Sequence, residues 1–185
     1  MLFKETDRQL IDKALGGSQR AWMRLVKKHE QRVYNHCLRL CGSAADAMDL
    51  MQEVFLAVYR NLPNFHGNSQ FVTWLFRITA NKTTDWLRSK HRIPTQGASE
   101  ITADHKVTEH SPYHDIHAKQ RNQQITQHLD QLNAEQRIVI ELKFFQHFTF
   151  DEIASQIGIS PNTVKTRLYA GLRKLKSQME VQNVV

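Results

Sequence analysis

A run of basic and hydrogen-bonding side chains near the C-terminus has the residue types and spacing to bind nucleic acid. From Pro161 to Lys176 the chain carries no acidic residue. Lysine and arginine neutralise phosphates, while amide and hydroxyl side chains hydrogen-bond to base edges in the major groove. The candidate DNA-contacting residues are Asn162, Thr163, Lys165, Thr166, Arg167, Tyr169, Arg173 and Lys174.

The pattern around these residues predicts two helices joined by a tight turn. Thr149 has a capping-box partner in Glu152, and Gly158 is placed to end the first helix in the left-handed conformation. Ser160 would cap the second helix. A helix-turn-helix of this kind offers its basic face to the major groove, although an ordinary two-helix corner with a solvated basic face has the same pattern. The buried stripe of the second helix is Val164, Leu168, Leu172 and Leu175.

Basic and aromatic side chains also gather on a helix expected over residues 70–92, for which Ser69 is a candidate N-cap. The helix follows Pro63 and the loop NFHGNS, and its later turns surround Trp86 with basic and polar groups. Aromatic side chains beside cations are typical of single-stranded nucleic-acid sites. Burial in the core is the commoner role of such aromatic residues, so both interpretations stay open.

Three acids lie on one face of a helix expected after Ser43. Asp46, Asp49 and Glu53 are spaced i, i+3 and i+7, in a chain whose net charge is +7. Acids near a helix N-terminus are favoured by the helix dipole, which explains a solvated face. The alternative is a docking strip for a basic partner.

Composition predicts an all-α protein of two small helical domains. The 185 residues include only seven glycines and four prolines, which favours long helices. The polar run TQGASEITADHKVTEHS interrupts the helical period, so we expect an N-terminal domain at 1–94, a flexible linker at 95–115 and a helix-turn-helix domain at 116–185. No apolar run has the length of a membrane span, and the N-terminus lacks a signal-peptide core, so a cytoplasmic location is expected.

Two groups of potential metal ligands each have a simpler explanation, as buried thiols or as solvated histidines. Cys37 and Cys41 lie at i, i+4 in a helical pattern and are expected to be reduced, buried thiols. His105, His110, His114 and His117 crowd the linker, where solvated histidines are common. No second ligand set accompanies either group, so no metal and no cofactor is expected.

Three long blocks resemble the extracytoplasmic-function sigma factors of bacterial RNA polymerase. They are DAMDLMQEVFLAVYRNLPNF at 46–65, FHGNSQFVTWLFRITANKTTDWLR at 65–88 and LNAEQRIVIELKFFQHFTFDEIASQIGISPNTVKTRL at 132–168. The resemblance implies a protein without a catalytic centre of its own. It would bind core RNA polymerase, direct it to the −10 and −35 elements of promoter DNA, aid promoter melting and be held by an anti-sigma factor.

The resemblance also assigns roles to residues. Phe65, Ser69 and Asn81 would form the pocket for a flipped −10 base. The recognition helix described above would read the −35 element. The residues implied in core-polymerase binding are Asp46, Asp49, Leu50, Gln52, Glu53 and Phe55, and those implied in −10 binding are Phe65, Ser69, Arg77, Asn81, Lys82, Arg88 and Arg92.

The chain departs from the family pattern at Ala170, where many members have arginine, and at Gly171, where they have alanine. The first departure removes a possible base contact, and the glycine is expected to weaken its helix by roughly 1 kcal/mol. Two other functions were weighed. A stand-alone helix-turn-helix regulator would lack a use for the acidic strip, and a metal-dependent phosphohydrolase has only the His114-Asp115 pair in its favour.

Overall fold

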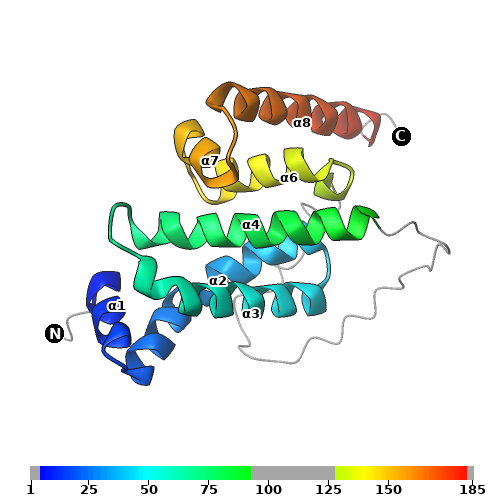
Figure 1. Ribbon diagram of the computed structural model, residues 1–185. Coiled ribbons are helices and arrows are strands. Elements are labelled where there is room, and N and C mark those ends of the chain that lie inside the picture. Colours follow the sequence, from blue (N-terminus) through cyan, green and yellow to red (C-terminus); the bar gives the residue numbers. More distant parts are fainter. Residues whose placement is uncertain (1–4, 93–127, 183–185) are drawn as a thin grey trace.

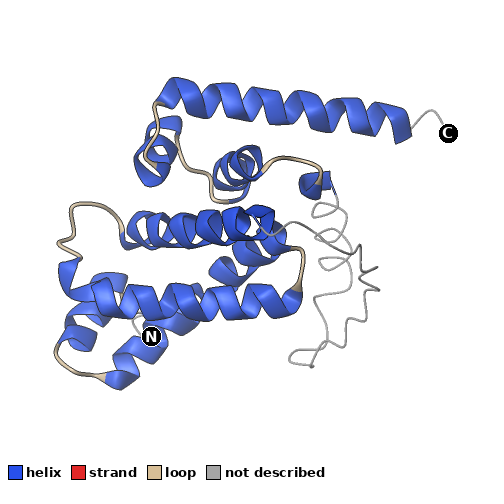
Figure 2. Cartoon of the chain, turned by 45° about the vertical axis from the view of Figure 1, so that its right-hand side comes forward, coloured by secondary structure: helices blue, strands red, loops and turns tan. Residues whose placement is uncertain are grey.

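The computed structural model describes residues 5–92 and 128–182. Within these ranges the regular structure is helical and contains no strand (Figure 2). The expected linker at 95–115, the histidines from His105 to His117 and the start of the expected domain at 116–185 lie outside the described residues. The elements are α1 Asp7–Leu15, α2 Gln19–Cys41, α3 Ala44–Asn61, the 3-10 turn η1 Leu62–Asn64, α4 Phe71–Arg92, α6 Ala134–Ile140, the π-helical turn η2 Glu141–Phe145, α7 Phe150–Ile157 and α8 Pro161–Gln182.

The helix ends follow the capping residues of the sequence closely. Ser18 and Ser43 accept backbone N–H bonds at the starts of α2 and α3, and Gly42 ends α2 with φ 73°. Thr149 and Glu152 form the predicted capping box of α7, which Gly158 ends with φ 70°. These contacts are local in the chain, which is why spacing alone predicted them correctly.

One expectation about a helix boundary is wrong. Ser69 does not cap α4, since the helix begins at Phe71 and the Ser69 hydroxyl donates to the Gln70 carbonyl at 3.4 Å. The helical segment that Asn133 caps is not α-helical throughout, because Glu141–Phe145 forms a π-helical turn. Such turns are rare in proteins, and those that occur are often found at functional sites.

The N-terminal helices, α1–α4, share a core of aliphatic side chains. Leu25 of α2, Val54 of α3 and Leu75 of α4 are at most 1% exposed. Phe76 is also fully buried and lies next to His36 and Phe148. Since Phe148 precedes α7, this ring connects the N-terminal core to the second group of helices.

The C-terminal helices, α6–α8 with η2, lie directly on the N-terminal group. Figure 1 shows α4 between α2 and α3 on one side and α6 and α7 on the other, with α8 outermost. Contacts join α4 to both α6 and α7, and α8 packs on α6 and α7 without lying against α4 in this view. The two groups therefore form consecutive layers.

Candidate nucleic-acid and polymerase interfaces

The predicted DNA-binding face of α8 is open to solvent. Val164 is fully buried and Leu168 is 3% exposed, as the predicted stripe requires, whereas Tyr169 is 56% exposed. The Ser160 hydroxyl accepts the N–H of Thr163 at 3.1 Å and so caps the helix. The exposed members of the predicted −35 set are Asn162, Lys165, Thr166, Tyr169, Arg173 and Lys174, while Thr163 and Arg167 are half-buried.

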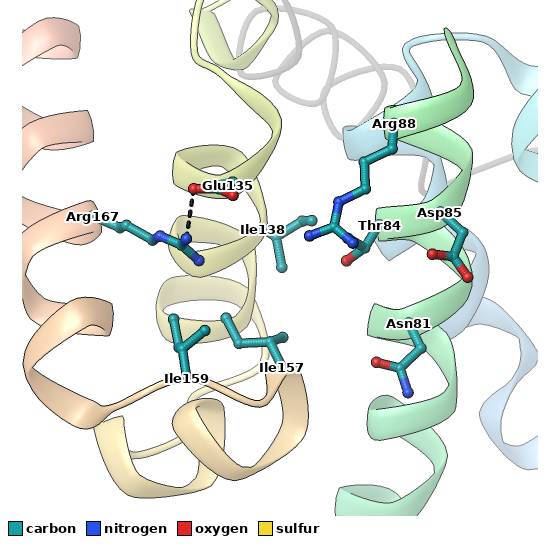
Figure 3. A pocket seen from close by; sticks show the side chains of 9 residues that line it. All are labelled: Asn81, Thr84, Asp85, Arg88, Glu135, Ile138, Ile157, Ile159 and Arg167. Carbon is teal, nitrogen blue, oxygen red and sulfur yellow. Dashed lines mark ion pairs between the residues drawn. The ribbon is translucent and has the colours of Figure 1, made fainter. Parts of the chain in front are cut away.

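Several side chains of this face already have partners within the chain, including Thr163, whose hydroxyl lies 2.8 Å from that of Ser160, and Lys165, which lies 5.5 Å from the centroid of the Phe150 ring. Arg167 forms an ion pair with Glu135 of α6 at 2.6 Å, drawn as a dashed line in Figure 3. The Thr166 hydroxyl donates to the Asn162 carbonyl at 3.0 Å. A phosphate contact by Arg167 must therefore compete with a carboxylate.

Gly171 has a packing role that helix propensity did not reveal. A Cβ atom at this position would lie 2.8 Å from Cδ1 of Ile140, whose side chain is buried in the contact between α6 and α8. Glycine lowers helix propensity, as expected, but it also lets α8 approach α6 closely. An added methyl group would require Ile140 to shift.

Three of the predicted −10 residues, Arg77, Asn81 and Arg88, lie on the side of α4 that faces the C-terminal helices, whereas Lys82 points toward Glu53 of α3. Arg77 lines a cleft of about 580 Å³ whose opposite wall includes Asp151 and Glu152 of α7. Asn81 and Arg88 line a second cleft, of about 310 Å³. In Figure 3 their side chains extend from α4 toward α6 and α7, where Glu135, Ile138, Ile157 and Ile159 form the far wall with Arg167 of α8.

An aromatic cluster holds the loop before α4. Phe65 lies 5.6 Å from Phe71 and 5.2 Å from Trp74, measured between ring centroids, and is half-buried. Ser69 is exposed at the rim of the larger cleft. On the later turns Lys90 lies over the ring of Trp86 at 5.0 Å. Phe65 and Ser69 therefore line one cleft and Asn81 the other, and the side chain of Arg92 is outside the described residues.

The acidic strip of α3 is partly solvent-facing and partly core. Asp49, Gln52 and Glu53 are exposed, whereas Leu50 and Phe55 are only 3% and 9% exposed and belong to the N-terminal core. Leu50 and Phe55 therefore offer a partner little surface.

Lysines of α4 approach two of these acids. Glu53 lies 3.6 Å from Lys82, and Asp46 lies 3.5 Å from Lys90. These pairs are solvent-exposed and individually weak.

A buried ionic cluster between the two helix groups was not predicted from sequence. Arg39 of α2 donates to both carboxylate oxygens of Glu141, at 2.7 and 2.8 Å, and its guanidinium lies 4.2 Å from the centroid of the Phe145 ring. His36 Nδ1 lies 3.2 Å from Glu141 Oε1. Arg32 donates to the side-chain and backbone oxygens of Gln146 at 2.7 and 3.0 Å, and Gln146 donates to Glu141 at 3.0 Å.

Glu141 is charged within this cluster despite its complete burial. Burial alone would raise the pKa of its carboxyl group, but hydrogen bonds from Arg39 and the proximity of His36 bring the pKa below its ordinary value. Glu141 and His36 are both 0% exposed, and Arg39 is 7% exposed. In the sequence, Arg39 and Glu141 stand at core positions of helical patterns, but these patterns do not reveal that the two residues pair.

Both cysteines are free thiols of low reactivity. Burial raises the pKa of Cys41 to about 12 and raises that of Cys37 further still. A thiolate is the reactive form, so neither side chain is activated for redox or metal chemistry. Within the described parts of the chain, no three His, Cys, Asp or Glu side chains are placed to hold a metal ion.

Comparisons with known proteins agree with this geometry. The Sigma-70 region 2 family matches residues 25–93, and the Sigma-70 region 4 family matches 122–175. RNA polymerase sigma-H factor of Pseudomonas aeruginosa is 30% identical over 178 residues, which are 91% of each chain. ECF RNA polymerase sigma factor SigW of Bacillus subtilis is 31% identical over 174 residues, 88% of this chain and 91% of that protein.

Solved structures share the fold. CnrH, in complex with the cytosolic domain of CnrY, has a TM-score of 0.69 at 24% identity and covers 96% of this chain and 99% of that one. RpoE of Bartonella quintana, in complex with the anti-sigma factor NepR, has a TM-score of 0.64 at 20% identity, covering 86% and 96%. No helix in the described ranges is long and apolar enough to cross a bilayer.

A helical protein with an acidic strip on α3, a basic and aromatic α4 and an open recognition helix has the parts of a transcription initiation factor. The chain belongs to the extracytoplasmic-function (ECF) family of RNA polymerase sigma factors.

Proposed function

We propose that this protein is an alternative sigma factor that binds core RNA polymerase, directs it to promoters with defined −10 and −35 elements, and aids opening of the duplex. The observation that carries the proposal is the exposed face of α8, which is free of acids from Pro161 to Lys176 and is held by a capped helix-turn-helix. A face of this kind fits the major groove. The family to which the chain belongs indicates that its protein partner is RNA polymerase.

Three surfaces divide this work. The exposed acids of α3, with Asp49 and Glu53 at their centre, bind a basic surface of core polymerase. The side of α4 that carries Arg77 and Asn81 binds the single-stranded −10 element, because cations and aromatic residues together hold phosphates and bases. The −35 element binds α8. Leu50 and Phe55, which lie in the core, support the α3 surface from beneath.

The division into domains follows the same logic. Residues 1–94 form the polymerase- and −10-binding domain, 95–115 the linker and 116–185 the −35-binding domain. The two elements lie roughly 25 base pairs apart, which is about 85 Å of duplex at 3.4 Å per pair. The protein acts in the cytoplasm and has no catalytic centre of its own. Because similar folds are known in complexes with anti-sigma factors, such a protein is the expected inhibitor.

The proposal is tested by run-off transcription with bacterial core polymerase on a library of promoter fragments, with and without the protein. Initiation at defined start sites that depends on the protein supports the proposal. Binding of −35-like duplex without any effect on polymerase would instead identify a stand-alone helix-turn-helix regulator.

A charge reversal tests the polymerase surface. Asp49→Lys should weaken binding to core polymerase at least tenfold, because the partner surface is basic. The matched control is Asp12→Lys, which reverses an exposed acid on α1, outside all three surfaces. Equal binding by both variants would contradict the assignment of α3.

A further inference from the structure

Gly171 of α8 is buried at the contact with α6, behind the proposed reading face. Successive residues of an α-helix are about 100° apart around its axis, so Gly171 lies on nearly the opposite side of α8 from Tyr169 and Arg173. Figure 1 shows α6 lying alongside α8. The contact at Gly171 therefore supports the reading face from behind.

The space beside Gly171 is too small for a side chain. A Cβ atom there would lie 2.8 Å from Cδ1 of Ile140 and 3.3 Å from Cβ of Gln136. Ile140 is only 4% exposed, so the end of its side chain has little free space into which it could turn. The Cβ atom of Gln136 moves only if α6 itself moves. An alanine at this position would therefore push α8 and α6 apart.

The end of α6 is held more firmly than α8. Ile140 is the last residue of α6 and is followed directly by the π-helical turn. Its neighbours Val139 and Glu141 are both 0% exposed, and Arg39 of α2 donates to both carboxylate oxygens of Glu141. One whole face of α8, by contrast, is open to solvent. When the two helices compete for space, we therefore expect α8 to move.

A second contact holds the same side of α8 one turn earlier. Arg167 forms its ion pair with Glu135, the residue before Gln136 in α6 (Figure 3). Arg167 and Gly171 are four residues apart, so they share one side of the helix. Two consecutive turns of α8 are thus held against α6. Because the contacts lie at two points along the axis, they determine the tilt of α8 as well as its distance from α6.

We propose that Gly171, through its close contact with Ile140, is a positioning residue that sets the tilt of α8 and hence the register of its reading face on duplex DNA. Lys165 and Arg173 are eight residues apart, about 12 Å along the helix axis. A tilt of α8 therefore moves them by different amounts relative to the bases, and binding residues must be held within about 0.5 Å of their productive positions. The inference rests on the proposed function for the identity of the ligand, whereas the packing contact does not depend on it.

Removal of the opposing atom provides the central comparison. Gly171→Ala introduces the 2.8 Å contact, and Ile140→Val removes Cδ1, the atom that makes it. In the double variant only the 3.3 Å contact remains, which a movement of a few tenths of an ångström relieves. Ser177→Ala is the matched control, because it also raises helix propensity in α8 but at an exposed position beyond the proposed reading face.

The first test measures duplex binding by the intact protein with fluorescence anisotropy. The probes are a duplex that the parent protein selects from a random pool and a scrambled duplex of the same composition. Gly171→Ala should weaken binding to the selected duplex by about tenfold, the effect of losing one base contact. Binding to the scrambled duplex should stay unchanged, because it depends on phosphates. The double variant and Ser177→Ala should bind both duplexes as the parent does.

Three results of this test would overturn the proposal. The first is an unchanged preference for the selected duplex in Gly171→Ala. The second is a double variant that binds as weakly as the single one. The third is an equal loss of affinity for both duplexes, since partial unfolding rather than a tilt of α8 would explain it.

The second test measures the packing contact without DNA. Denaturation midpoints of the parent, the two single variants and the double variant form a double-mutant cycle. The midpoint shift caused by Gly171→Ala should be more stabilising in the Ile140→Val background than in the parent, because only there is helix propensity gained without the close contact. Equal shifts in both backgrounds would overturn the packing contact and the proposal with it. If the parent selects no duplex, the proposed function fails at α8 and so does the DNA-reading role of Gly171, while coupling in the cycle would still establish the contact.

Discussion

The two helices proposed to read DNA differ in how they are presented. On α8 the proposed reading face is solvent-exposed, and Tyr169 is 56% exposed. On α4 the corresponding residues line clefts walled by α6 and α7. The residues proposed to read duplex DNA therefore lie on an open face, whereas those proposed to bind the single strand are exposed to water but face a second layer of helices.

The contacts behind each helix differ as well. Behind α8 the packing is aliphatic, through Val164 and Leu168, and fixes its position relative to α7. Between the two helix groups the contact combines the Phe76–Phe148 ring pair with the ion pair of Arg39 on α2 and Glu141 on η2. Apolar burial stabilises the first contact throughout, while the second also depends on charged groups that water stabilises.

The largest effect on this comparison is expected from Phe76→Ala. Phe76 is fully buried and its ring contacts Phe148, so its loss removes packing from the N-terminal core and from the contact between helix groups. Truncation of a buried phenylalanine lowers the free energy of unfolding by about 3–5 kcal/mol. Tyr169→Ala, on the open face of α8, should change it by less than about 0.5 kcal/mol. Chemical denaturation measures both, and similar losses would contradict the contrast.

The next effect concerns binding by the free protein. Arg173→Ala should weaken binding to −35 duplex by about 1–3 kcal/mol, the usual value of a base contact. Arg77→Ala should leave this duplex affinity unchanged but reduce promoter opening in the complete holoenzyme. Fluorescence anisotropy and permanganate footprinting measure the two steps. Loss of duplex affinity in Arg77→Ala would show that α4 is already accessible.

Acid should weaken the contact between helix groups. The pKa of Glu141 lies below its ordinary value of 4.5, so its charge stabilises this contact above that value and the stabilisation is lost as the pH falls through the lowered pKa. The loss is about 1.4 kcal/mol for each unit of pKa lowering. Denaturation curves at pH 7 and below 4.5 measure it. Glu141→Gln should remove this part of the pH dependence, and an unchanged profile would contradict it.

The smallest effect is expected at Glu135. Its ion pair with Arg167 is partly exposed, and pairs of this kind contribute about 0.2–1 kcal/mol. Glu135→Gln should therefore free Arg167 and tighten −35 duplex binding by up to about fivefold at low salt, with a smaller gain at high salt. A weakened affinity would mean that Glu135 positions Arg167 for DNA binding rather than competing with DNA for it.

Sequence reasoning succeeded where the determining contacts are local. Thr149, Gly158 and Ser160 act on backbone groups within a few residues, so their spacing was enough. The apolar stripe of α8 was predicted for the same reason. The start of α4 was missed because Ser69 lies in a loop whose path depends on the aromatic contacts of Phe65.

Contacts distant in the chain could not be predicted. Arg39 and Glu141 are 102 residues apart, and nothing in either local pattern shows that one faces the other. Gly171 was interpreted through helix propensity alone, since its neighbour Ile140 belongs to another helix. The residues proposed to bind polymerase and DNA were identified by family resemblance, and their roles stay predictions.

The π-helical turn Glu141–Phe145 has an evolutionary consequence. A π turn spans one residue more than an α turn, so it corresponds to a one-residue insertion in an otherwise α-helical ancestor. Deleting one residue there would rotate every following side chain by about 100° about the helix axis, one residue of an α-helix. Phe148 and the helix-turn-helix would then lose their alignment with α2 and α4. Relatives that carry a gap at this position should therefore lack the Arg39–Glu141 pair, so the length of this short segment predicts whether the pair can form.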